Sequence, residues 1–266
     1  MKILFVLSFL LVQLYAGLIK APILSIDEEA GTATFAVEKI DLGVSGFAVH
    51  KIADGHTSIL KSVVVSAFDA EQKIATVKLE DFNALRNNAL PSGKWKLAVG
   101  DTLELAFGYS RALLVAPSEE IYYRITRSVK VQWVHPDLFA TVLSFRGHPT
   151  PLKEDFEAMS IASSCGLLFL YLEQKVYTVD MLSFTILSIS DAPLTQDSVK
   201  LPFYSRVEEI EANWFGEGSD ELEEYEPHYY ELLVLNNRAN KELYEIVKEK
   251  EGLRKLLDKF QLEEKQ

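Results

Sequence analysis

Short runs of alternating hydrophobic and polar residues dominate the first 116 positions of the chain. The run ILSIDEEAGTATFAVEKI at 23–40 places two apolar segments around a Gly-containing turn, which is typical of a β-hairpin. Strand-like runs follow at 59–68, 73–82, 101–107 and 112–116, and the last two are expected to pair across Gly108-Tyr109-Ser110-Arg111. Short strands separated by regular turn signals predict a small β-barrel or sandwich.

The pattern changes after this β-rich part. Ser118 and the two glutamates after it predict the start of a helix that runs to Arg127, because a serine side chain caps free N–H groups. A strand is expected at 129–134, then helical spacing at 136–145 and 152–161, followed by strand-like runs at 166–173, 175–179, 184–190 and 200–207. Helices followed by consecutive strands favour an α+β fold over an alternating βαβ sheet. We therefore expect a β-rich subdomain over 17–128 and an α+β subdomain over 129–212.

The last part of the chain divides into an acidic loop, 213–226, and a helical tail, 227–266. Ten carboxylates and no lysine or arginine lie between Arg206 and Arg238, and the Gly216-Glu217-Gly218 run interrupts regular structure. The tail predicts an amphipathic helix with a narrow apolar seam, formed by Leu243, Ile246, Leu253, Leu257 and Phe260. Such a seam suits either a partner helix or docking on the protein's own body.

Composition and charge narrow the classes of partner. The 266 residues are 48% hydrophobic, which is enough for a folded core, and the formal net charge of −12 comes largely from the acidic segment. An acidic chain without a basic stripe repels phosphate groups, which argues against nucleic acid or an anionic membrane surface as a partner.

The first 16 residues predict export. Lys2 precedes an apolar run, and Ala16 offers a small residue for cleavage, as in a secretory signal peptide. The run is short for an uncleaved membrane anchor, which is the alternative. We expect an exported protein in the periplasm or on the outer cell surface, with no membrane-spanning segment after cleavage.

No combination of side chains predicts catalysis, a cofactor or a metal. The five histidines lie in unrelated segments without the spacing of a zinc site, and Ser163 and Ser164 lack the glycine-flanked turn of a nucleophile. The lone Cys165 cannot form an internal disulfide and is interpreted as a buried small hydrophobic residue. The acidic loop lacks the residue order of a calcium loop, so a solvated loop is favoured. We expect a protein that is not an enzyme, and the sequence does not decide its oligomeric state.

Five blocks of the sequence carry a family resemblance: GFAVHKI at 46–52, LLVAPSEEIYYRI at 113–125, DLFATVL at 137–143, PFYSRVEEIEA at 202–212 and YYELL at 229–233. Over about residues 20 to 235 the chain resembles the N-terminal domain of the plasminogen-binding surface proteins of epsilonproteobacteria. The resemblance implies a secreted or surface protein of a Gram-negative bacterium that captures host plasminogen through lysines near the C-terminus.

This chain departs from that pattern because it ends in Gln266 without a terminal lysine. Lysines that lie close to carboxylates in the tail are then the candidate ligand-binding residues: Lys248, Lys250, Lys255, Lys259 and Lys265. The other interpretation of these lysines is a solvated helix surface. The alternative function is a periplasmic cell-envelope scaffold or assembly protein that uses its C-terminal helix to bind a partner.

Overall fold

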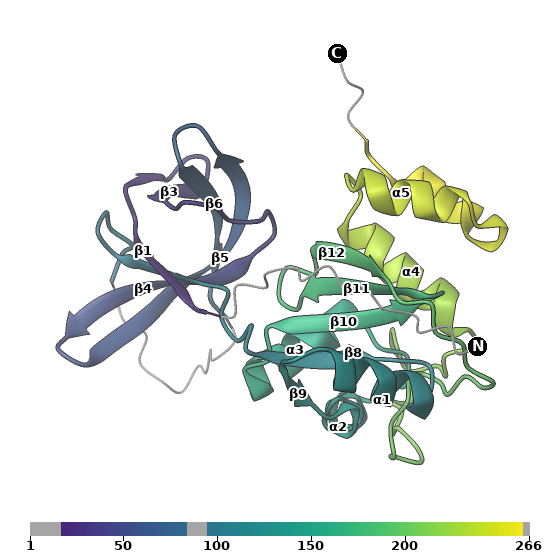
Figure 1. The fold of residues 1–266 in the computed structure, drawn as a ribbon. Coiled ribbons are helices and arrows are strands. Elements are labelled where there is room, and N and C mark those ends of the chain that lie inside the picture. The colour runs from purple at the N-terminus through teal and green to yellow at the C-terminus, as the bar shows by residue number, and fades with distance from the viewer. Residues whose placement is uncertain (1–16, 84–94, 263–266) are drawn as a thin grey trace.

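The computed structural model of the protein describes residues 17–83 and 95–262, in which a curled sheet lies beside a second, helix-covered sheet (Figure 1). The predicted signal peptide, 1–16, and Lys265 lie outside the described residues. Across the described parts of the chain, no helix is both long enough and apolar enough to cross a membrane.

The first sheet is a curled antiparallel sheet, which confirms the predicted barrel-like N-terminal part. Its strand order is β1-β7-β4-β5-β6-β3-β2. The strands are β1 (Ile19–Pro22), β2 (Ser25–Asp27), β3 (Thr32–Ala36), β4 (Ser45–Ala53), β5 (His56–Asp69), β6 (Ile74–Asp81) and β7 (Thr102–Leu105). The predicted hairpin is the β2–β3 pair. The edge strands β1 and β2 are consecutive in the chain, and Ile23 N donates to Asp101 O at 2.8 Å while Leu24 N donates to Thr34 O at 2.8 Å. The short connection from β1 to β2 thereby links the two edges of the curled sheet.

The second sheet is mixed, in agreement with the expected α+β class. Its order is β12-β11-β10-β8-β9, with parallel pairing among β10, β8 and β9 and antiparallel pairing among β10, β11 and β12. The strands are β8 (Arg111–Val115), β9 (Gln132–Val134), β10 (Leu167–Leu172), β11 (Lys175–Asp180) and β12 (Ile186–Asp191).

The helices α1 (Glu119–Ser128), α2 (Pro136–Arg146) and α3 (Lys153–Ser163) lie where the sequence predicts them. Ser118 caps α1 as expected, since its Oγ accepts a hydrogen bond from Ile121 N at 3.3 Å. Pro136 occupies the first turn of α2, where a missing N–H costs nothing.

The expected pairing of the runs 101–107 and 112–116 is wrong. β7 ends the first sheet, whereas β8 is a central strand of the second sheet, parallel to both of its neighbours. The apolar run from Ala112 to Val115 is buried on both faces, which is the pattern of a central parallel strand and not of a hairpin edge. The change of sheet falls between Leu105 and Arg111, ahead of the boundary predicted near Ser128.

Two hydrophobic cores share the strands of the second sheet. Successive residues of β10 alternate between them: Leu168 and Leu170 face the core that contains α2, α3 and the C-terminal helices, while Leu167 and Phe169 face the core that contains α1 and the first sheet. This alternation follows from the two-residue repeat of a strand, and it makes β10 part of both cores.

Asp180, at the end of β11, joins the two sheets. Its Oδ2 accepts hydrogen bonds from Ser45 N at 2.9 Å, Ser45 Oγ at 2.8 Å and Tyr109 OH at 2.7 Å. Its Oδ1 accepts from Leu182 N at 3.0 Å and Ser183 N at 2.8 Å. The side chain is fully buried, so five donors from three segments depend on one carboxylate.

The predicted strand at 200–207 is also wrong, because this segment forms no regular strand. Pro202 has no N–H to donate, and the segment bonds to the backbone after β8 through Lys200 N to Pro117 O at 2.7 Å and Tyr204 N to Ala116 O at 2.8 Å. Phe203 is buried in the core of α2 and α3, whereas Tyr204 is buried in the other core. The segment thus contributes one aromatic residue to each core.

The C-terminal part is helical, as predicted, but it consists of three segments: α4 (Tyr225–Asn236), α5 (Lys241–Lys248) and the 3₁₀ helix η1 (Glu251–Lys259). Asn237 ends α4, where its side chain accepts from Ile186 N at 2.8 Å and donates to Phe184 O at 3.0 Å. Of the predicted seam, Leu243 and Leu253 are buried in the chain's own core, whereas Ile246, Leu257 and Phe260 are partly buried against it. Val247 and Leu256, which the prediction did not include, are also buried there. The sequence left two uses open for the seam, a partner helix or docking on the protein's own body. The structure shows the second.

Candidate functional site

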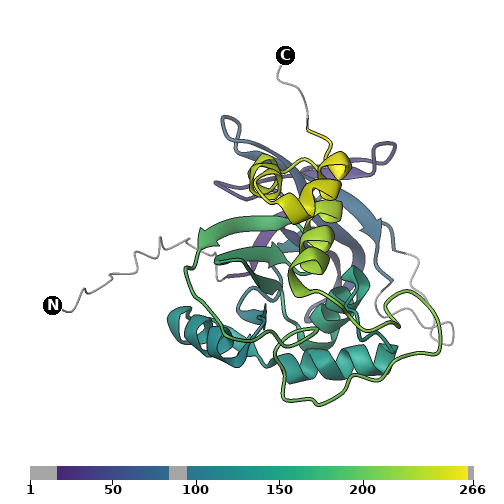
Figure 2. The same cartoon turned by 90° about the vertical axis from the view of Figure 1, so that its right-hand side faces the viewer.

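The four candidate lysines that the structure describes lie on α5, on η1 and on the connection between them, at the end of the molecule opposite α2 and α3 (Figure 2). Lys255 and Lys259 are exposed on η1, and neither has an ion-pair partner among the described residues. Lys248 is exposed too, but its Nζ lies 3.3 Å from Glu245 and 5.8 Å from the centre of the Tyr244 ring. Of the candidate lysines, Lys255 and Lys259 are therefore the two that are exposed and have no ion-pair partner among the described residues.

Lys250 differs from these lysines because it is bound within the chain. Its ammonium forms an ion pair with Glu173 and lies 5.6 Å from the centre of the Tyr230 ring. Burial lowers the pKa of Lys250. Glu173 lies in the tight turn between β10 and β11, so this contact fastens the start of η1 to the second sheet. A carboxylate and an aromatic face are what a protein uses to bind an ammonium, and here they are occupied by the protein's own lysine.

Glu226 is the second unusual ionisable group of this region. It lies one helical turn before Tyr230 on α4, and burial raises the pKa of its carboxyl to about 7. Its Oε2 atom is buried and has no hydrogen-bond partner among the described residues. A carboxylate without a donor is costly to bury, so this carboxyl keeps its proton to a higher pH than an exposed glutamate does.

Replacing Glu226 with glutamine should make the folded state less sensitive to pH. The folded state binds the Glu226 proton more tightly than the unfolded chain does. Protonated Glu226 therefore stabilises the fold fully below pH about 4.3, relative to high pH, and this stabilisation is lost as the pH rises through about 7. At pH 8 the Glu226→Gln variant should be more stable than the wild type by about 1–2 kcal/mol, since partial exposure weakens the effect.

Urea unfolding at pH 4 and pH 8 measures this difference, which should vanish at pH 4. Glu223→Gln, which changes an exposed carboxylate of the same segment, is the matched control and should leave the pH dependence unaltered. An equal stability change for Glu226→Gln at both pH values would contradict the prediction.

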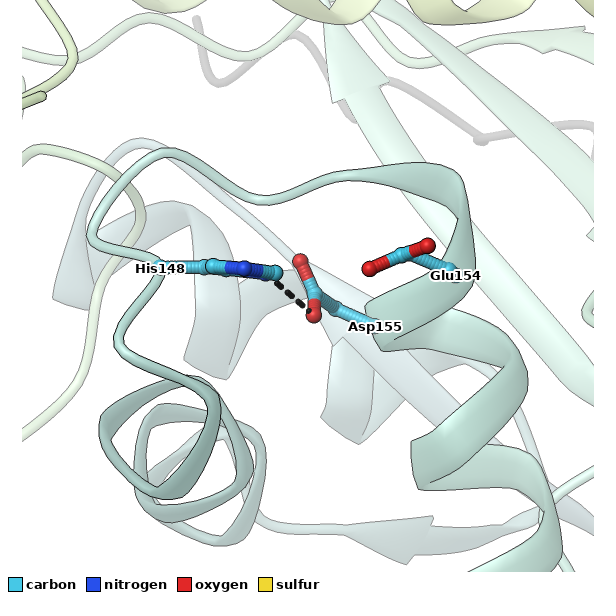
Figure 3. A group of neighbouring side chains, drawn as sticks. All are labelled: His148, Glu154 and Asp155. Carbon is cyan, nitrogen blue, oxygen red and sulfur yellow. Dashed lines mark hydrogen bonds and ion pairs between the residues drawn. The ribbon is translucent and has the colours of Figure 1, made fainter. Parts of the chain in front are cut away.

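A second group, His148, Glu154 and Asp155, has the geometry of a metal site, because one ligand atom from each lies within 4.8 Å of the others (Figure 3). However, Asp155 Oδ1 already accepts from His148 Nδ1 at 2.9 Å and from Arg146 Nε, and Asp155 Oδ2 accepts from Leu152 N at 2.7 Å. Arg146 also pairs with Glu154. A guanidinium that neutralises both carboxylates competes directly with a cation, so we interpret the group as an ion-pair network that fastens the α2–α3 loop.

Cys165 is fully buried, as the sequence analysis expects. Burial raises the pKa of its thiol to about 12, and its Sγ lies 3.6 Å from Leu167 O. A thiol in this state is a poor nucleophile, so the structure gives no support to a catalytic cysteine.

The sequence singled out the tail lysines as candidates, but it did not indicate the partners of Lys250. Glu173 and Tyr230 are 57 positions apart and meet Lys250 only because α4 packs on the second sheet. The local signal was the YYELL block at 229–233, whose aromatic residues carry part of the family resemblance. The raised pKa of Glu226 could not be inferred from the acidic run around it, because it depends on burial.

Comparison with known proteins gives one family. The family model described as "Plasminogen-binding protein pgbA N-terminal" matches residues 18–233. Two curated relatives, both named plasminogen-binding protein PgbA and from Helicobacter pylori strains J99 and 26695, are each 27% identical over 207 residues. The match covers 75% of this chain but 44% of each relative, so the chain spans less than half of the relatives' length. No solved structure matches. The matched region ends before α5, and all of the candidate lysines lie beyond it.

Proposed function

The chain belongs to the plasminogen-binding protein pgbA N-terminal family, and on that basis we propose that it is an exported binding protein whose partner is plasminogen. The observation that carries the proposal is the family match over residues 18–233. The names of the relatives describe binding of a protein and not catalysis. Export is supported by the signal-like run at residues 1–16.

Within this proposal, Lys255 and Lys259 of η1 are the residues that contact plasminogen. The support comes from their exposure and lack of ion-pair partners among the described residues. Asp258 lies three residues after Lys255, so it shares a face with it in a 3₁₀ helix and places an anion beside the ammonium. A kringle pocket combines an anionic pair with aromatic rings, which suits a lysine that has a neighbouring carboxylate.

Changing both lysines should weaken binding to plasminogen. The Lys255→Ala/Lys259→Ala variant should bind immobilised plasminogen about tenfold more weakly in surface plasmon resonance, since loss of a charged contact is worth about 1.4 kcal/mol or more. A soluble lysine analogue should abolish binding of the unaltered chain.

The matched control is Lys39→Ala/Lys78→Ala, which removes two exposed lysines of the first sheet's subdomain and should bind like the wild type. Binding that is insensitive to the lysine analogue would contradict lysine-mediated capture while leaving family membership intact. Absence of any binding would contradict plasminogen as the partner.

The scaffold alternative requires a free apolar seam on the tail. In this structure Leu243, Val247, Leu253 and Leu256 are buried in the chain's own core. A partner helix would therefore have to displace packed side chains, and no observation favours this function over plasminogen binding.

A further inference from the structure

The outer face of α2 carries large apolar side chains that no part of the described chain covers. Leu138 is 53% exposed and Phe145 is 87% exposed. They lie seven positions apart, so they share one face of the helix about two turns from each other. The opposite face, with Phe139 and Leu143, is fully buried, which leaves α2 apolar on both sides.

The segment 211–217 adds two aromatic residues beside this face. Glu211 N donates to Ser144 Oγ at 3.2 Å, Asn213 N donates to Gly147 O at 2.9 Å, and Asn213 Nδ2 donates to Arg146 O at 2.7 Å. These bonds hold the segment against the C-terminal end of α2, next to Phe145. Trp214 and Phe215, which follow at once, are 98% and 83% exposed.

Four exposed apolar side chains along one helix and the segment bonded to it differ from the single exposed apolar residues that every surface carries. We call Leu138, Phe145, Trp214 and Phe215 the aromatic patch. Clustered exposed apolar residues mark interaction sites, and tryptophan is among the residues that contribute most to protein–protein binding. Leu138 lies in the first turn of α2, and the bonds of Asn213 place Trp214 and Phe215 near the C-terminal end of the helix, next to Phe145. The patch thus follows α2, which lies on the side of the molecule away from α5 and η1 (Figure 2).

The rim of the patch is strongly acidic. Eight exposed carboxylates lie between 208 and 224, and none has an ion-pair partner among the described residues: Glu208, Glu209, Glu211, Glu217, Asp220, Glu221, Glu223 and Glu224. The two nearby arginines are already paired, Arg206 with Asp137 at 2.7 Å and Arg146 with Asp155 and Glu154. The rim therefore has a net negative charge that the described part of the chain does not neutralise.

We propose that the aromatic patch is a docking surface for a basic segment of a partner protein, one in which lysine or arginine alternates with apolar side chains. Apolar side chains of such a segment would cover Leu138 and Phe145, and its guanidinium or ammonium groups would lie on the Trp214 and Phe215 rings and pair with the rim carboxylates. The charge complementarity selects this class of partner over an anionic lipid surface. The surface is separate from the lysines of η1, so it does not depend on the proposed plasminogen contact.

Fluorescence anisotropy with a dye-labelled peptide of alternating arginine and leucine residues tests this proposal on the full chain. The wild type should bind the peptide, and the Trp214→Ala/Phe215→Ala variant should bind it at least about tenfold more weakly, as expected for loss of two central aromatic contacts. Trp95→Ala, which removes a 46% exposed tryptophan of another region, is the matched control and should bind like the wild type. Because Trp214 and Phe215 are exposed, the double variant should keep the wild-type thermal midpoint.

Three results would overturn the proposal. One is equal affinity of the wild type and the double variant for the peptide. Another is that the wild type binds a peptide in which glutamate replaces arginine as tightly as it binds the arginine peptide, which would indicate nonspecific apolar adhesion. The third is concentration-dependent self-association of the wild type that the double variant loses, because the occupant would then be a second copy of this chain.

Discussion

Replacing Asp180 with alanine should lower the free energy of unfolding by about 4 kcal/mol or more, a large share of the roughly 5–15 kcal/mol that stabilises a typical domain. The substitution leaves five hydrogen-bond donors without their acceptor. The donors of Ser45 and Tyr109 are in buried residues, where water cannot replace the lost partner. Burial and the nearby Asp180 raise the pKa of Tyr109 well above its ordinary value, so this hydroxyl remains a donor at all moderate pH values.

Urea unfolding followed by circular dichroism measures the effect. Because Asp180 joins the first sheet to the second, its loss should also separate the unfolding of the two sheets, so that far-UV and near-UV transitions no longer coincide. Asp191→Ala is the matched control: Asp191 is exposed on the same sheet and pairs with Lys175, and its loss should cost less than about 1 kcal/mol. If Asp180→Ala lowers the free energy of unfolding by less than about 1 kcal/mol, the contact between the two sheets does not depend on this carboxylate.

Gly46→Ala should destabilise the protein by about 3 kcal/mol or more, although it adds a single methyl group. A Cβ atom at Gly46 would lie 2.1 Å from Glu104 O and 2.7 Å from Leu105 Cα. Both atoms belong to the backbone of β7, which pairs with β4 at this position, so no side-chain rotation can relieve the overlap. The two strands would have to separate, with loss of their hydrogen bonds.

Thermal and urea unfolding of Gly46→Ala and Gly252→Ala check this prediction as a pair. Gly252 lies in η1, and nothing lies within 4 Å of the position that a methyl group would take there, so alanine should be neutral or stabilising by up to about 1 kcal/mol. Equal stability of the two variants would mean that β4 and β7 tolerate a wider separation than the structure has. The structure shows that glycine is needed at position 46 because the backbones of β4 and β7 approach closely there.

Much of the local structure followed from the sequence. The hairpin at 23–40, the cap at Ser118, the proline at the start of α2 and the three strands after α3 all depend on residues close together in the chain. The candidate lysines were found in the same way, by their type and their charged neighbours, and the family resemblance was carried by short blocks of residues.

The sequence by itself determined the class of the elements, the acidic segment, the amphipathic tail and the family, because periodicity, capping and charge are properties of neighbouring residues. Only the tertiary structure decided that β8 belongs to the second sheet and that Lys250 pairs with Glu173, while Lys255 and Lys259 have no ion-pair partner among the described residues. It also decided that the side chains of the aromatic patch are exposed among the residues that the structure describes. Strand pairing and side-chain exposure depend on segments far apart in the chain. The apolar run 112–116 is compatible with a strand of a hairpin and with a strand of a parallel sheet. The packing of the whole fold therefore decides between the two.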